Sequence, residues 1–351
     1  MDPRSEHARL AAKVQATLAG VLEVGPAEVE VHAGHPSGAD VVISAAGQTY
    51  VVEFTKSGSA GSIASAAKKV LESARRTRKR CVPLVAVPFM GEVGCVVCRE
   101  AGVGWLDLSG NARIVARGVR VNVAGRPNRF RSAGRPPNLF APKSSRVARW
   151  FLMHPFAAIR QREIARATGL DEGFVSRIVS RLEREQYIVR EKGGGVCPGD
   201  PALLLDAWRD AYQFSRHTLH QGHVAARSGD ALLRFVVDAL VGEGVAHAAT
   251  GLAAAWALTR FAAFRTATVY VPDDPSPALL ERLGFREDPR GGNLWLVVPN
   301  DVGVFDGAVE KDGIRCVHPV QVYIDLKAHP ERATEAAERL RAELLHWRRS
   351  G

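Results

Sequence analysis

Hydrogen-bond donors recur on one side of the segment that follows Asp171. They are spaced by three and four residues, as one face of a helix requires: Ser176, Arg177, Ser180, Arg181 and Arg184. An arginine fork matches the O6 and N7 acceptors of guanine, and a serine hydroxyl can bond to a base or a phosphate. We therefore expect Arg177 and Arg181 to contact guanine edges in the major groove of double-stranded DNA, with the other donors beside them.

The elements that would position these donors are two short helices. The apolar side of the second helix has the spacing of a stripe that packs on a core: Val175, Ile178, Val179 and Leu182. Gly169 interrupts the preceding pattern, and the carboxylate of Asp171 is placed to cap the new helix. The first helix has a small apolar face formed by Ile164, Ala165 and Ala167. This order predicts a helix-turn-helix.

Two strand-like stretches, residues 187–190 and 195–198, flank Lys192-Gly193-Gly194 and predict a hairpin, the wing. We expect Arg162, in the first of the two helices, and Lys192, in the hairpin turn, to meet phosphates. Residues 143–200 are thus predicted to form a winged helix-turn-helix. A helix bundle whose arginines are only solvated remains the alternative.

The preceding linker, residues 125–142, is rich in proline, glycine and arginine, which opposes a helix. Its Arg126, Arg129 and Arg131 could follow the minor groove as an extended arm, or form a charged tether. Residues 125–200 contain 15 Lys/Arg and 7 Asp/Glu, a net charge of +8, against +4 for residues 1–124 and −2 for residues 201–351. The positive charge is concentrated where neutralisation of DNA phosphates would use it.

The chain as a whole, at 351 residues, is too long for one core, so two or three domains are expected. Its 46% apolar and 24% charged residues are typical of a globular protein. The sequence contains no apolar run of about eighteen residues, so no membrane span is predicted. The N-terminus lacks a signal-peptide core, and five unevenly spaced cysteines favour reduced thiols. These features predict a cytoplasmic protein with no membrane partner.

Residues 1–124 alternate helix-like and strand-like stretches, which predicts an α/β domain with a mixed sheet. Asp40 begins one expected strand, and Glu53 lies near the end of the next. This arrangement resembles the PD-(D/E)xK nucleases, in which an acid on each of two adjacent strands binds a divalent metal. The resemblance implies Mg²⁺ held by Asp40 and Glu53, with a lysine to activate the attacking water.

The lysine departs from that pattern. In the family it stands two residues after the second acid, on the same face of the strand. Here Thr55 has that position, and Lys56 follows it, pointing to the other face unless the strand contains a bulge. We therefore expect a nuclease-derived scaffold without catalysis or cofactor. A Mg²⁺-dependent DNA endonuclease that uses Asp40, Glu53 and Lys56 is the alternative.

Residues 201–351 predict a further domain of mixed α/β or α+β type. The domain has no P-loop, no GxSxG elbow and no HExxH motif. His217, His220 and His223 recur every three residues near a helix pattern. Because no cluster of carboxylates or cysteines accompanies them, they favour a helix surface over a metal site.

Several short stretches resemble bacterial proteins related to the AbiEi-type antitoxins of type IV toxin–antitoxin systems. They are WLDLSGNA at residues 105–112 and, in order along the C-terminal region, TGLAAA, TVYV, LGFR, GNLWLVVP, VFDGA and HPVQVYIDL. The better-known antitoxins have their winged helix at the N-terminus, whereas here it is central. The resemblance implies sequence-specific DNA binding, autorepression and a partner nucleotidyltransferase toxin. Recognition helices often act in pairs on half-sites, which favours a homodimer.

Overall fold

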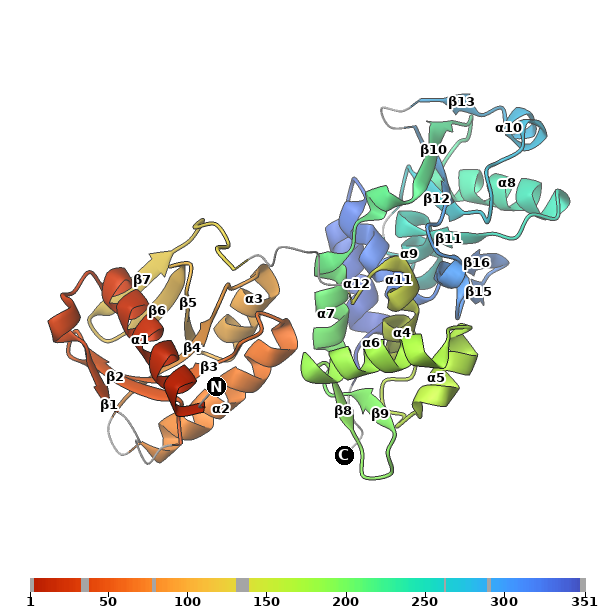
Figure 1. Cartoon of the computed structure of the whole chain (residues 1–351). Coiled ribbons are helices and arrows are strands. Elements are labelled where there is room, and N and C mark those ends of the chain that lie inside the picture. The colour runs from red at the N-terminus through yellow and green to blue at the C-terminus, as the bar shows by residue number, and fades with distance from the viewer. Residues whose placement is uncertain are drawn as a thin grey trace. The chain divides into compact units, whose positions relative to one another are not determined.

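The computed structural model describes residues 3–32, 38–77, 80–130, 139–261, 263–288 and 292–347, with side chains from residue 9 onward. The chain divides into two compact units, Met1–Pro137 with Leu182–Tyr187, and Asn138–Arg181 with Ile188–Gly351. Each unit contains a seven-stranded mixed sheet with helices around it (Figure 1). The predicted class, a multidomain α/β protein, is confirmed at this level.

The sheet of the N-terminal unit has its strands in the order of the sequence, β1 to β7. Their bounds are β1 Glu30–His32, β2 Val41–Ala45, β3 Gln48–Phe54, β4 Val82–Val87, β5 Gly104–Asp107, β6 Ala112–Ala116 and β7 Val119–Val123. β3, β4 and β5 run parallel, because the helices α2 (Ala60–Arg76) and α3 (Glu92–Glu100) provide the crossovers between them. The outer strands pair antiparallel.

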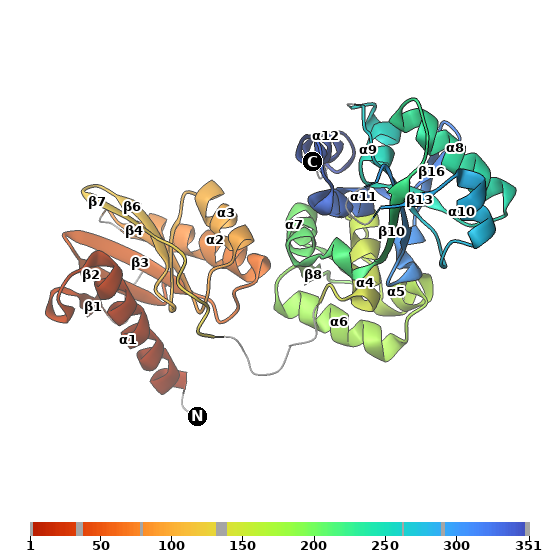
Figure 2. The same cartoon turned by 90° about the horizontal axis from the view of Figure 1, so that it is seen from above.

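Helices cover both faces of this sheet. Helix α1 (Pro3–Leu22) lies on one face, while α2 and α3 lie on the other (Figure 2). Since side chains alternate along a strand, neighbours in β3 face different cores: Val52 packs with Leu18 of α1, and Val51 packs with Ile63 of α2. A sheet buried on both faces explains the continuous apolar run of β4.

The WLDLSGNA stretch forms the turn between β5 and β6. Asp107 is fully buried and accepts hydrogen bonds from the backbone N and the Nδ2 of Asn111, each at 2.9 Å. The Asn111 side chain also accepts a bond from the Arg126 backbone N at 2.8 Å and donates to its carbonyl at 3.1 Å. Gly110 has φ +100°, and a Cβ there would lie 2.4 Å from Nη1 of Arg126. This stretch therefore anchors the first residues of the linker on the N-terminal unit.

The sheet of the second unit has the order β13-β10-β14-β12-β11-β16-β15. Its strands are β10 Thr218–His223, β11 Ala248–Thr250, β12 Ala267–Tyr270, β13 Arg286–Glu287, β14 Leu294–Val298, β15 Val309–Lys311 and β16 Ile314–Cys316. The helices of this part are α7 Pro201–Ala211, α8 Gly229–Gly242, α9 Gly251–Thr259, α10 Pro277–Leu283, α11 Pro319–Asp325 and α12 Ala333–Leu344. Among the described strands of this sheet, only the pairs β12–β14 and β11–β16 are parallel.

The same unit begins with three helices and a hairpin: α4 Pro142–Met153, α5 Gln161–Thr168, α6 Glu172–Arg184, β8 Ile188–Arg190 and β9 Val196–Pro198. Helix α4 packs against α5 on one side and against α7 and α11 on the other. Its central position connects the α5–α6 pair to the seven-stranded part. None of the helices in the described ranges combines the length and the apolar character that a bilayer crossing needs.

Candidate nucleic-acid interface

The turn between α5 and α6 has the conformation that its sequence predicts. Gly169 ends α5 in the left-handed region, with φ +63°, where a residue with a Cβ is strained. The Asp171 carboxylate then accepts a hydrogen bond from the backbone N of Phe174 at 3.0 Å, which caps the first turn of α6. The predicted cap is confirmed.

Helix α6 buries its apolar stripe as expected. Val175, Ile178, Val179 and Leu182 are all buried. In α5 the prediction was partly wrong: Ile164 and Ala165 are buried, but Ala167 is exposed and Thr168 takes the inner position. The Thr168 hydroxyl satisfies itself by donating to the carbonyl of Ile164 at 2.7 Å, so a polar residue fits in the core at this helix end.

The outer face of α6 presents a row of donors. Arg177, Ser180 and Arg184 are exposed, whereas Ser176 and Arg181 are half-buried. The guanidinium of Arg177 lies 5.9 Å from the ring centroid of Phe174, a cation–π contact near the start of the helix. Of the two arginines expected at guanine edges, Arg177 is thus the more accessible.

The two expected phosphate-contacting residues lie in other elements. Arg162 is exposed on α5, with its Nε 3.5 Å from a carboxylate oxygen of Glu172 at the start of α6. Lys192 is exposed in the turn between the antiparallel strands β8 and β9. That turn is closed by a bond from the backbone N of Gly194 to the carbonyl of Glu191 at 2.9 Å. The predicted hairpin is present.

The arginines of the linker belong to the other unit. Arg126 is exposed and has its backbone bound by Asn111, while the backbone N of Arg129 donates to the Ser109 hydroxyl at 3.2 Å. Arg131 lies outside the described residues. The structure therefore holds the start of the linker by its backbone and leaves two guanidinium side chains on the surface.

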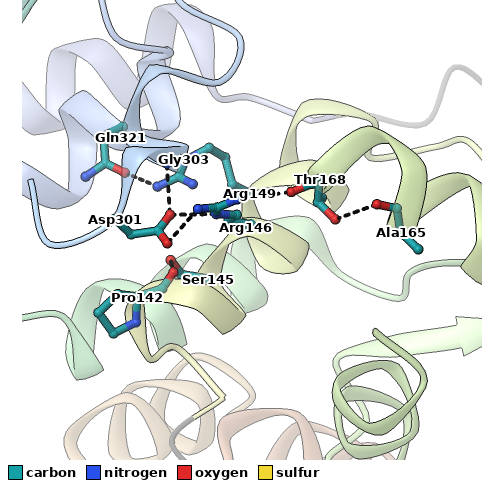
Figure 3. Close-up of polar contacts among 9 residues, drawn as sticks. All are labelled: Pro142, Ser145, Arg146, Arg149, Ala165, Thr168, Asp301, Gly303 and Gln321. Atoms are coloured by element: carbon teal, nitrogen blue, oxygen red, sulfur yellow. Dashed lines mark hydrogen bonds and ion pairs between the residues drawn. The ribbon is translucent and has the colours of Figure 1, made fainter. Parts of the chain in front are cut away.

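One arginine joins α4 to two other elements, which the sequence alone did not indicate. Nε and Nη2 of Arg146 pair with the two carboxylate oxygens of Asp301 at 2.7 and 2.9 Å. Its Nη1 donates to the carbonyl of Thr168, the last residue of α5, at 3.2 Å (Figure 3). This bidentate geometry is the strong form of an arginine–carboxylate pair. The α5–α6 pair is thereby tied to the loop before the short helix η3 (Val302–Phe305).

A second missed feature is a buried polar cluster around Asp325. Its carboxylate accepts from the hydroxyls of Thr250 and Tyr212, both at 2.6 Å, from Nε2 of Gln321 at 2.8 Å and from the Tyr270 hydroxyl at 3.1 Å. Gln321 in turn accepts from Nη2 of Arg149 at 2.6 Å. Burial raises the pKa of Asp325 to about 6, although these donors act in the opposite direction.

The three histidines do not lie on a helix, so that prediction was wrong. His217 precedes β10, while His220 and His223 are in that strand. His217 is buried, and its Nε2 is 2.7 Å from the Tyr212 hydroxyl, whereas His220 and His223 pair with Asp274 and Asp288. Strand residues at a spacing of three point to opposite faces, so the repeat does not gather them. Within the described ranges, no three His, Cys, Asp or Glu side chains converge as a metal site.

Asp40 and Glu53, the two acids of the nuclease-like pattern, come together at the adjacent strands β2 and β3. Val41 of β2 pairs with Val52 of β3, so extending the antiparallel register by one residue sets Asp40 opposite Glu53. Asp40 accepts a bond from the backbone N of Phe54 at 2.9 Å, and Glu53 is 8% exposed. Lys56 is exposed beyond the end of β3, and the amine of Lys69, from α2, lies 3.8 Å from Glu53.

The chain is thus a multidomain α/β protein with a helix pair and hairpin built onto its second unit. Residues 199–346 match the family described as "Transcriptional regulator, AbiEi antitoxin, Type IV TA system". This region is therefore similar to the AbiEi antitoxins, as the C-terminal motifs predicted. The match does not extend to the WLDLSGNA stretch. Neither the curated proteins nor the solved structures gave a significant match.

Proposed function

We propose that the protein is a sequence-specific transcriptional regulator that binds double-stranded DNA in the cytoplasm through a winged helix-turn-helix, residues 143–200. The observation that carries the proposal is the outer face of α6, where Arg177, Ser180 and Arg184 are exposed opposite a fully buried stripe. The left-handed Gly169 and the Asp171 cap support the turn, and the β8–β9 hairpin supports the wing. The net charge of +8 on residues 125–200 supports binding to phosphates.

In this proposal α6 is the recognition helix and enters the major groove by its N-terminal end. Arg177 and Arg181 contact guanine edges, and Ser176 and Ser180 contact bases or phosphates. Arg162, Arg184 and Lys192 contact the phosphate backbone around the groove. The linker arginines Arg126, Arg129 and Arg131 add charge to the same DNA partner. Their contribution does not depend on sequence.

A gel-shift titration at several salt concentrations tests these roles. Arg177→Ala should weaken binding to the operator by roughly 5- to 150-fold and relax its sequence preference, because a bidentate base contact contributes roughly 1–3 kcal/mol. Lys192→Ala should weaken binding to all sequences alike and lower the salt slope by about one. The control is Arg234→Ala, an exposed helical arginine on α8. Full sequence-specific affinity in both Arg177→Ala and Arg181→Ala would refute the assignment.

We further propose that the protein is an autoregulating antitoxin with a nucleotidyltransferase toxin as its partner, and that it acts as a homodimer on paired half-sites. The family description of residues 199–346 supports the antitoxin role. Co-expression tests it: the protein should restore growth to cells that express the toxin encoded beside it. Repression of a reporter placed behind its own promoter should be lost in Arg177→Ala.

A metal-dependent endonuclease is the second candidate function, and the opposed Asp40 and Glu53 favour it. Lys69 gives this site an amine from α2. Cleavage of duplex DNA with Mg²⁺ or Mn²⁺, abolished in both Asp40→Ala and Glu53→Ala, would establish this activity. Intact DNA under all conditions would leave the N-terminal unit as a scaffold.

A further inference from the structure

A small cavity lies in the second unit where α4, α7, the short helix η2 (Phe214–Arg216) and the loop before η3 meet. Its volume is about 30 Å³, which is larger than the space that a single water molecule needs. The lining includes the first turn of α4 at Pro142 and Ser145, the guanidinium-bearing Arg149 and Arg216, and Gln321. Figure 3 shows four of these residues, Pro142, Ser145, Arg149 and Gln321, around the start and middle of α4.

Arg149 is the unusual member of this lining. It is 3% exposed, and its guanidinium lies 5.2 Å from the ring of Trp208. Nη2 donates to Gln321, but Nε and Nη1 are buried without a hydrogen-bond partner among the residues that the structure describes. Asp301, the neighbouring carboxylate, is already engaged by both oxygens with Arg146. Asp306 and Asp325 act on Arg149 only at longer range.

A buried guanidinium with unused donors is costly unless an anion compensates it. Burial lowers the pKa of Arg149, but an arginine keeps its proton at neutral pH. The rest of the lining favours an anion as well. Arg216 is a second, exposed cation, and the twelve-residue helix α4 directs its positive end to the cavity. Asp301 is the one acid among the described residues of the lining.

We propose that this cavity binds the carboxylate or phosphate group of a small soluble molecule. Arg149 donates to the anion from the buried side of the cavity, and Arg216 contacts it at the solvent side. The cavity itself admits only the anionic group, so the remainder of the ligand extends past Arg216 into solvent. Arg149 and Arg146 share α4, and Arg146 contacts the end of α5. Occupation of the cavity therefore shifts the preferred orientation of the α5–α6 pair and changes DNA affinity.

Calorimetric titration of the full chain with inorganic phosphate and with acetate, at constant ionic strength and without DNA, tests the site. We expect saturable binding of at least one of the two anions. Arg216→Ala should weaken it by about tenfold, as loss of one charge-assisted hydrogen bond does. Arg149→Met should abolish it, and Arg234→Ala should leave it unchanged. Because Arg216 is exposed, its variant is informative even where the Arg149 variant folds poorly.

Absence of saturable binding in the wild type, or equal binding by Arg149→Met and the wild type, would overturn the proposal. Displacement of bound phosphate by a short duplex without the operator would also overturn it, since the occupant would then be the DNA backbone. Control of DNA affinity by the anion rests on the proposed DNA-binding function, whereas anion binding does not. The two are separated by repeating the gel shift with and without the anion in the wild type and in Arg149→Met.

Discussion

The two units of the chain differ in the surroundings of a buried acidic side chain. In the N-terminal unit Glu53 is nearly buried, but it is paired with Lys69, whose side chain is 62% exposed. In the second unit Asp325 is fully buried and accepts four hydrogen bonds, three of them from the buried side chains of Thr250, Tyr270 and Gln321. The first acid remains within reach of solvent ions, while the second is part of the core. A buried acid alone therefore does not indicate a reactive site.

The largest expected difference between the two acids is in stability. Asp325→Ala removes the acceptor that four side chains share and leaves the buried Thr250 hydroxyl without its carboxylate, so we expect the free energy of unfolding of the second unit to fall by roughly 3–5 kcal/mol. Urea unfolding followed by tryptophan fluorescence measures it. Asp325→Asn retains one acceptor and should lose less. A loss under about 1 kcal/mol in the alanine variant would remove the contrast with Glu53.

The pH dependence of stability should come from buried histidines of the second unit together with Asp325. Burial lowers the pKa values of His217, His318 and His329 to about 4, below their ordinary 6.5. Between pH 4 and 6 the unfolded chain therefore holds three more protons on these histidines, which favours unfolding as the pH falls. Asp325 opposes them, because its raised pKa of about 6, above 3.8, keeps one proton in the folded state.

The net difference, at most two protons and smaller near pH 4 and pH 6, predicts that stability falls by about 2 kcal/mol for each pH unit from pH 6 down to pH 4. Denaturant titrations at pH 4.5, 5.5 and 7 measure this slope. In Asp325→Asn the opposing proton is lost, and the slope should steepen by about 1 kcal/mol per pH unit. An unchanged slope in that variant would show that Asp325 does not titrate in this window.

The smallest effect is expected at Glu53. Glu53→Gln keeps an amide oxygen in place and removes the charge that Lys69 pairs with. Because that lysine is largely exposed, the free energy of unfolding of the N-terminal unit should change by less than about 1 kcal/mol. Thermal unfolding of the variant, with Lys69→Met beside it, checks this. A large loss in Glu53→Gln alone would place this acid with Asp325 as a core residue.

Much of the N-terminal fold was predictable because its signals are local. Strands β2 and β3 are joined by a tight turn, α2 and α3 follow strands directly, and the sheet order repeats the sequence order. The α5–α6 pair was predictable for the same reason, since Gly169, Asp171 and the α6 stripe lie within a few turns of each other. Ala167, expected on the inner face, is exposed and Thr168 is buried instead, because helix ends are set by packing as well as by pattern.

The second unit was less predictable, because its contacts join distant residues. β13, β15 and β16 have two or three residues each, too few for a periodic signal. Arg146 and Asp301 are 155 positions apart, and Arg149 and Gln321 are 172 apart. One signal was present: Gln321 and Asp325 stand four residues apart in the apolar stretch HPVQVYIDL. Polar residues at that spacing inside an apolar helix predict a shared buried contact.

The contacts of Arg146 also limit which fragments of this protein can fold by themselves. Residues 143–200 have the length of a module that could be moved to another protein, yet the carboxylate that holds Arg146 comes from residue 301. A truncation after residue 200 would leave the guanidinium that also holds the carbonyl of Thr168 without its carboxylate partner. The helix pair and the C-terminal region are therefore expected to fold and function together rather than as separable parts.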